Sequence, residues 1–190
     1  MENNFLQGIE KNIEDILLQY VAVRSDTGTI LERDIEKFWL NHFDKIEYFR
    51  NNPQYVGLYK IPEDILGRSV SYALLKGQGK DTVVLLHHND VVDVEDFKNL
   101  QHLAYSPLEL AEELKKISHE LLEEAREDLL SGEYYFGRGV CDMKGGAAIQ
   151  MALLERYSKI KDFRGNILLL SVPDEENLSA GMRAAVELMD

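Results

Sequence analysis

Residues 82–90 read TVVLLHHND, an apolar run that ends in two histidines, an asparagine and an aspartate. The run is short and β-branched at its start, which is typical of a strand buried on both faces of a parallel sheet. Polar side chains that directly follow such a strand lie at the carboxyl edge of the sheet, where α/β proteins bind their ligands. This stretch therefore predicts an α/β fold and also the place of its functional site.

The sequence on either side alternates helical patterns with further strands. Apolar residues recur at helical spacing in four segments, 5–23, 30–46, 143–157 and 179–189. Strand patterns occur in three further segments, 69–75, 133–136 and 165–172. Such alternation predicts helices on both faces of a sheet that is joined by crossover connections. We expect an α/β three-layer sandwich with a mixed, largely parallel sheet.

Composition and charge narrow the class of protein. The 190 residues include 34 acidic and 21 basic side chains, a formal net charge of -13. This excess of acid favours solubility and argues against a nucleic-acid partner, which needs a basic surface. No apolar run approaches the ~20 residues of a membrane span, and the N-terminus lacks the pattern of a signal peptide. We therefore expect a cytoplasmic protein with neither a membrane nor a nucleic-acid partner.

Residues 106–129 form an acidic segment with the apolar periodicity of a helix. Residues 106–109 read SPLE, the pattern of a capping box with proline at the first helical position. An apolar stripe over 110–129 then predicts one amphipathic surface helix with a solvated acidic face. Within it, residues 119–123 read HELLE, but Glu123 stands where a zincin helix has its second histidine. We interpret HELLE as a turn of the surface helix.

His88 and Asp90 form the first candidate pair. Residues two apart on a strand point to the same side, so Asp90 can accept a hydrogen bond from one ring nitrogen of His88. This bond would aim the other nitrogen at a metal. Taken alone, a His-x-Asp pair has a structural role more often than a metal-binding one. His87 should face the opposite side of the sheet, as a packed or hydrogen-bonded core histidine.

Asp142 lies in the second cluster, residues 137–146, which read GRGVCDMKGG. The glycines permit a tight turn and close approach of the backbone. A carboxylate at the start of the following helix is also favoured by the helix dipole, so a helix cap is the alternative to a metal ligand. A dinucleotide-binding loop is disfavoured, because its third glycine is missing and Asp142 would repel phosphate. Cys141, the only cysteine, is expected to be a small buried residue.

Residues 174–176 read DEE and form the third cluster, directly after the predicted strand over 165–172. Three successive acids repel one another unless they are solvated or bound to cations. Because successive side chains diverge, Glu175 and Glu176 can have different roles, one on a metal and the other on its water. A solvated acidic loop is the alternative. If the three strands run in the same direction, all three clusters meet at one edge of the sheet.

Together the clusters resemble the metallopeptidase superfamily of acetylornithine deacetylase, succinyl-diaminopimelate desuccinylase, carboxypeptidase G and the aminoacylases. The resemblance rests on His88-x-Asp90, on the GRG and DMKGG runs of 137–146, and on PDEE with a glycine further on in 173–181. It covers nearly all of the chain. The long acidic stretch between Asp90 and the GRG run is more similar to the branch of the arginine-utilisation protein RocB.

This resemblance implies a zinc-peptidase-like fold with a site for two metals. His88 would bind one ion, Asp142 would bridge both, and Glu176 would bind the second. Asp90 would orient His88, and Glu175 would be the general base. The implied cofactor is Zn²⁺, two ions per complete site, with Co²⁺ or Mn²⁺ as alternatives. The implied reaction is hydrolysis of an amide bond in a small peptide or N-acyl amino acid.

The family pattern also contains a later carboxylate ligand, a histidine near the C-terminus, and a lid and dimerisation domain. This chain ends at residue 190, fourteen residues after Glu176 (190 − 176 = 14). We therefore expect residues 1–190 to be the N-terminal portion of the catalytic domain, with an incomplete site, weak or no metal binding and no hydrolysis by this chain alone. The alternatives are a non-catalytic binding protein on the same fold and completion by a separate chain. An exposed sheet edge would favour a homo-oligomer.

Overall fold

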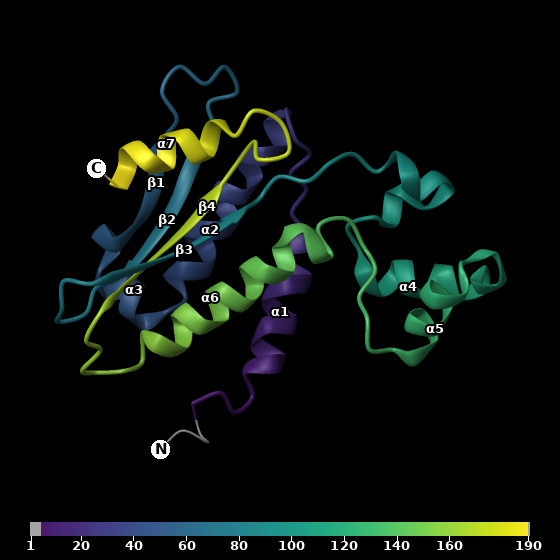
Figure 1. Cartoon of the computed structure of the whole chain (residues 1–190), viewed down its shortest axis with the longest axis horizontal. Coiled ribbons are helices and arrows are strands. Elements are labelled where there is room, and N and C mark those ends of the chain that lie inside the picture. Colours follow the sequence, from purple (N-terminus) through teal and green to yellow (C-terminus); the bar gives the residue numbers. More distant parts are fainter. Residues whose placement is uncertain (1–4, 190) are drawn as a thin grey trace.

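The computed structural model describes residues 5–189, and within them four strands form one mixed sheet in the order β1-β2-β4-β3 (Figure 1). The strands are β1 (Val56–Lys60), β2 (Ser69–Leu75), β3 (Thr82–His88) and β4 (Asn166–Val172). β3 is parallel to β4, whereas β1 with β2 and β2 with β4 are antiparallel. The predicted mixed α/β sheet is confirmed, but its parallel share is smaller than expected.

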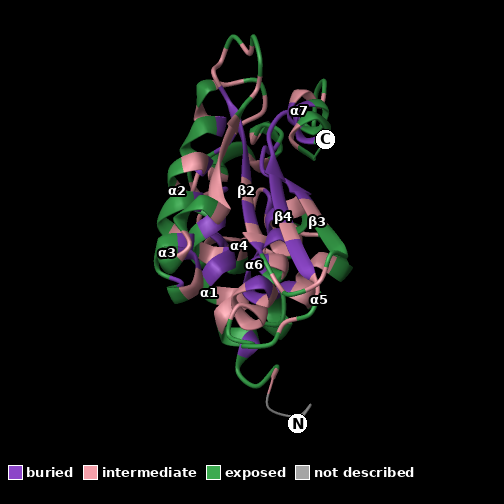
Figure 2. Ribbon diagram, turned by 90° about the vertical axis from the view of Figure 1, so that its left-hand side faces the viewer, coloured by how far each residue is buried: buried purple, intermediate pink, exposed green. Residues whose placement is uncertain are grey.

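Helices cover both faces of this sheet and make three layers (Figure 2). One face packs against the first helices of the chain and the helix after the GRG run: α1 (Ile9–Val21), α2 (Asp34–Asp44), α3 (Glu47–Asn51) and α6 (Gly146–Tyr157). The other face packs against α7 (Ala180–Met189). Short 3-10 turns precede α2 and β1, at η2 (Ile30–Arg33) and η3 (Pro53–Tyr55).

Alternating side chains of β4 enter the two cores. Leu169 is fully buried in the larger core, together with Trp39 of α2 and Met151 of α6. Its neighbour Leu170 is equally buried but belongs to the smaller core, with Ala185 of α7. Because both faces of the strand are covered, β4 reads as a continuous apolar run rather than an alternating one.

β3 lies at the edge of the sheet and is covered less completely. Val83 is 59% exposed and Val84 is 44% exposed, so the start of β3 is uncovered on both faces by the residues that the structure describes. The expected two-sided burial therefore holds for the end of β3, where His87 and His88 are buried, and fails at its beginning. Unpaired edge strands favour association with another chain, and the homo-oligomer stays a prediction.

The acidic segment forms a helical excursion that projects away from the sheet (Figure 1). It contains η4 (Glu95–Leu103), α4 (Pro107–Lys116), η5 (Ser118–Glu120) and α5 (Glu123–Ser131). The single helix predicted over 110–129 is wrong, because the chain leaves the helical conformation at Ile117 and again at Leu121, where the backbone is extended. The HELLE run begins in η5 and ends at the first residue of α5, with His119 exposed.

Two further local predictions are wrong. Pro107 does occupy the first turn of α4, but within the described residues the Ser106 side chain makes no capping hydrogen bond. Residues 133–136 form no strand in the described part of the chain. Instead, the Tyr135 hydroxyl donates to the Glu14 carboxylate of α1, so this aromatic run packs against a helix rather than pairing in the sheet.

A largely buried histidine, His42, makes the stability of this fold depend on pH. The His42 ring of α2 stacks on Phe38, and its Nε2 is buried with no hydrogen-bond partner among residues 5–189. Burial lowers the pKa of His42 to about 4, against an ordinary value of about 6.5. Protonation therefore favours the unfolded state. The stability that the neutral ring permits is complete above pH ~6.5 and declines as pH falls towards 4.

We predict that, when the pH is lowered from 6.5 to 4, the free energy of unfolding falls less for His42→Leu than for the wild type. The substitution removes a group that takes up a proton only on unfolding. Urea denaturation at several pH values measures the slope, with His119→Leu as the control at an exposed histidine. A His42→Leu slope equal to that of the wild type would contradict a buried, neutral His42.

Candidate metal centre

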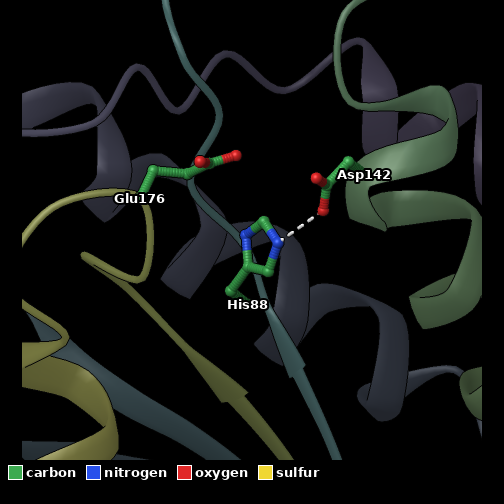
Figure 3. Close-up of side chains that lie close together, drawn as sticks. All are labelled: His88, Asp142 and Glu176. Atoms are coloured by element: carbon green, nitrogen blue, oxygen red, sulfur yellow. Dashed lines mark hydrogen bonds and ion pairs between the residues drawn. The ribbon is translucent and has the colours of Figure 1, made fainter.

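Three predicted ligands from separate elements converge at one edge of the sheet (Figure 3). His88 ends β3, Asp142 lies in the turn before α6, and Glu176 follows β4. One ligand atom of each lies within 4.8 Å of the others. This convergence follows from the parallel pairing of β3 with β4, which brings the carboxyl ends of both strands to the same edge.

The His88 ring is held between acids on both of its nitrogens. Nδ1 lies 3.0 Å from the backbone oxygen of Asp90 and 3.6 Å from its Oδ1, so the carbonyl is the nearer acceptor. Nε2 lies 2.8 Å from Asp142 Oδ1 and 3.9 Å from Glu175 Oε2. Burial lowers the pKa of His88, but the bonds to Asp90 and Asp142 outweigh burial and raise the pKa to about 9. Without a bound cation these acceptors favour the protonated ring, whereas a cation on Nε2 would replace its proton.

The Asp90 carboxylate also fixes the backbone of the loop after β4, a role that the sequence did not predict. It accepts hydrogen bonds from the backbone N–H groups of Glu175 (3.0 Å) and Glu176 (3.1 Å), and from the Thr27 hydroxyl (3.0 Å). Asp90 is fully buried. Burial raises the pKa of Asp90, but the bonds from His88 and from these donors outweigh burial and lower the pKa below its usual range. Asp90 thus ties the end of β3 to the loop after β4.

The backbone N–H of Asp174, which precedes those of Glu175 and Glu176, is bonded to another buried carboxylate. Asp174 N donates to Glu32 Oε2 at 2.9 Å, so three successive N–H groups of residues 174–176 donate to two buried acids. The Asp174 carboxylate accepts from Arg68 (2.8 Å) and from Ala180 N (3.0 Å). Asp174 has φ 69°, a left-handed conformation that is costly for a residue other than glycine. Sequence reasoning missed Glu32 and Arg68, which lie in no recognisable motif.

The turn that carries Asp142 spans Val140–Gly145 and leads directly into α6. Asp142 has non-helical φ and ψ, and its carboxylate accepts from His88 rather than from the N–H groups of α6, which disfavours the helix-cap alternative. Its side chain is 75% exposed. Cys141 is exposed as well, so its expected burial is wrong, because the turn directs this pair of residues outward.

Lys144 anchors the same turn from inside and was not singled out from the sequence. The residue is fully buried, and Nζ donates to Val23 O at 2.7 Å, just beyond the end of α1. Nζ also lies 5.4 Å from the centre of the Tyr20 ring. Burial lowers the pKa of Lys144 to about 7. The lysine therefore fixes the turn of Asp142 to the first helix through one hydrogen bond.

His87 faces the opposite side of the sheet, as predicted. The residue is 1% exposed, its Nδ1 lies 2.9 Å from Gln150 Oε1, and its Nε2 lies 3.4 Å from the Tyr20 hydroxyl. Burial lowers the pKa of His87 to about 4, so this ring is neutral near pH 7. The expectation of a hydrogen-bonded core histidine is confirmed.

The residues of the cluster fit a divalent cation. One imidazole and two carboxylates are a donor set suited to zinc, cobalt or manganese. Two donors on one zinc ion are at most about 4.4 Å apart, a spacing that exposed carboxylates reach by small rotations. Burial and the charge of Asp142 raise the pKa of Glu176, as expected where acids are crowded without an equal number of bases.

Comparison with known proteins shows which family and which relatives the chain is similar to. Residues 123–190 match the family model described as Peptidase family M20/M25/M40. The Uncharacterized protein YqjN of Bacillus subtilis (strain 168) is 41% identical over 171 residues, 90% of this chain and 30% of that protein. Protein RocB of the same organism is 32% identical over 179 residues, 93% of this chain and 31% of that protein. Residues 123–190 are thus similar to M20 peptidases, and nearly the whole chain is similar to YqjN and RocB. The chain spans about 30% of the length of both relatives.

Solved structures of a dipeptidase and a tripeptidase share the fold. Human carnosine dipeptidase 1 matches 98% of this chain and 37% of its own, with a TM-score of 0.64 and 17% identity. A tripeptidase from Staphylococcus aureus matches 95% of this chain and 41% of its own, with a TM-score of 0.59 and 16% identity. The predicted zinc-peptidase-like α/β fold is confirmed. None of the helices between residues 5 and 189 has the length and apolar content that a membrane crossing requires.

Close packing around the Asp142 turn can be tested with a pair of glycines. Gly139 has φ 78°, and an added Cβ would lie 2.8 Å from Val91 Cγ1 and 3.4 Å from Lys144 Cδ. Gly132 has φ 73° but meets nothing within 4 Å. We predict that Gly132→Ala costs about 1–2 kcal/mol of unfolding free energy from backbone strain, and that Gly139→Ala costs clearly more because its neighbours must also move. Chemical denaturation measures both, and equal losses would contradict the packed turn.

Proposed function

We propose that the chain carries the N-terminal part of a metal-dependent hydrolase of amide bonds, with His88, Asp142 and Glu176 as metal ligands. The observation that carries this proposal is the convergence of one imidazole and two carboxylates within 4.8 Å at the edge of the sheet. Similarity of residues 123–190 to a peptidase family supports hydrolysis as the reaction class. Structural neighbours named as a dipeptidase and a tripeptidase support a small peptide as substrate, with an N-acyl amino acid as the alternative.

The proposed cofactor is Zn²⁺, with Co²⁺ or Mn²⁺ as alternatives and two ions in a complete site. A carboxylate has two oxygens, so Asp142 would be able to hold both ions, while His88 and Glu176 would each hold one. A divalent cation bound there would polarise the scissile carbonyl and lower the pKa of a water molecule. Asp90 would keep the His88 ring in its orientation through Nδ1, which leaves Nε2 directed at the centre of the cluster.

Glu175 is the proposed general base. Its Oε2 lies 3.9 Å from His88 Nε2, and its side chain is 52% exposed, so it borders the cluster and remains accessible to water and substrate. Its backbone N–H is fixed by Asp90, which limits the directions that the side chain can take. Glu175 would accept a proton from the attacking water at a carboxylate oxygen and later return it to the leaving amine.

Residues 5–189 supply fewer ligands than a complete site. If Asp142 bridges, each ion has two protein ligands, against the three typical of a catalytic zinc ion. We therefore propose that hydrolysis requires further ligands, supplied by the same polypeptide or by a second chain. A non-catalytic binding protein on the same fold is the second candidate, favoured by the exposed start of β3 at Val83 and Val84. Pairing through this edge would make it a homo-oligomer.

Zinc binding by the purified chain tests the proposed ligands. We predict that the wild type binds zinc measurably but weakly in isothermal titration calorimetry, because the described residues supply only part of the ligand set. His88→Ala and Glu176→Ala should each weaken the affinity by more than the ~10–100-fold typical of changing a residue that only hydrogen-bonds a metal ligand. His119→Ala, at an exposed histidine of η5, is the matched control and should leave the affinity unchanged. A wild type that takes up no zinc, or uptake that survives both ligand substitutions, would contradict the proposed site.

A further inference from the structure

We propose that Glu32 and Arg68 are positioning residues that hold the Glu175–Glu176 turn in the direction needed for metal binding. Glu32 comes from η2, and Arg68 lies just before β2, so both are distant in sequence from every motif of the site. The inference rests on the proposed function, because it assumes that Glu176 binds a cation. It gives the Glu32–Arg68 ion pair, which lies outside the cluster of proposed ligands, a role in metal binding.

The contacts of Glu32 show how it acts on the turn. Its Oε2 accepts from Asp174 N at 2.9 Å, and its Oε1 accepts from Gly28 N and from Arg68 Nη1, both at 2.8 Å. Both carboxylate oxygens are therefore in use, and Glu32 is only 2% exposed. A glutamine at this position would replace one of these acceptor oxygens by a donor, so at least one of the N–H groups would lose its partner.

The Asp174 amide matters because it directly precedes the two glutamates of the site. A fixed N–H fixes its peptide plane, and the next two planes are fixed by Asp90 through Glu175 N and Glu176 N. Asp174 itself is in the left-handed conformation, which it would leave readily without outside support. Release of the Asp174 amide would therefore let the turn rotate and move the Glu175 and Glu176 side chains relative to His88.

Arg68 is the cation that makes this arrangement of buried acids stable. Nη1 lies 2.8 Å from Glu32 Oε1 and from Asp174 Oδ1, and Nη2 lies 2.8 Å from Asp64 Oδ1. Burial lowers the pKa of Arg68, but the three carboxylates outweigh burial and raise the pKa. The planar guanidinium spans separate carboxylates with fixed directions, which a lysine ammonium cannot reproduce. Arg68 therefore orients Glu32 as well as compensating its charge.

A merely structural role and a positioning role predict different results. A structural ion cluster would lower the free energy of unfolding when broken and leave the zinc affinity of the folded protein unchanged. A positioning role would change the affinity itself. Residues that hydrogen-bond metal ligands typically contribute about 10–100-fold to affinity, and Glu32 acts on the backbone of a ligand loop in the same manner.

The test is zinc titration of the wild type, Glu32→Gln, Arg68→Lys and Glu155→Gln, each shown to be folded by circular dichroism. Glu155 of α6 is the matched control, because it is a half-buried acid away from the cluster that accepts from Asn12 of α1 and from Lys159. We expect Glu32→Gln to raise the zinc dissociation constant by roughly 10–100-fold, Arg68→Lys to raise it as well, and Glu155→Gln to leave it unchanged. The cobalt absorption spectrum, a second readout, should shift in the first two variants only.

The outcomes distinguish the positioning role of Glu32 and Arg68 from the proposed function on which it rests. If the wild type binds zinc and the folded Glu32→Gln variant binds it equally well, the positioning role is overturned while the proposed ligands stand. If Glu32→Gln does not fold, Arg68→Lys decides in the same way, by its affinity and its cobalt spectrum. If the wild type binds no zinc, the proposed function fails and the positioning role fails with it.

Discussion

Three successive backbone amides, those of residues 174–176, donate their hydrogen bonds to the buried carboxylates of Asp90 and Glu32, and the site depends on this interaction. Hydrogen bonds to charged groups contribute about 1.5–3 kcal/mol each, more than neutral ones. They offset the left-handed backbone of Asp174 and fix the start of a loop that would otherwise be a solvated acidic turn. A ligand loop whose backbone is already held by hydrogen bonds loses less conformational entropy when a cation binds.

The sheet topology explains why this loop meets the other two clusters. β3 and β4 are the parallel pair of the sheet, so His88 and the DEE run leave it at the same edge. The turn before α6 is brought to that edge by Lys144, which fixes it to the end of α1. Among the residues that converge there, His88 is surrounded by carboxylates. The excess of negative charge favours an added cation at this point over any other small ligand.

The sequence predicted the parts of the structure that depend on local pattern. Buried strands and the polar residues after them were recognisable, and His88, Asp142 and Glu176 do lie together. The strand β1 was missed because VGLYK is short and contains a glycine, whereas the aromatic residues of 133–136 resemble a strand without forming one. Glu32 could not have been found, because its partner Asp174 is 142 residues away and no periodicity links them. The solved structures of a dipeptidase and a tripeptidase share the fold that presents this edge.

Amide hydrogen exchange, followed by nuclear magnetic resonance, tests most directly whether buried carboxylates fix the ligand loop. The account predicts that the amides of Asp174, Glu175 and Glu176 exchange slowly, at rates comparable to those of the buried strand β4 that precedes them, because each is bonded to a carboxylate excluded from solvent. Exchange at the rate of exposed loop amides, such as that of Gly132 beyond α5, would contradict it. The loop would then be solvated and mobile, and its two glutamates would not be preorganised to bind a cation.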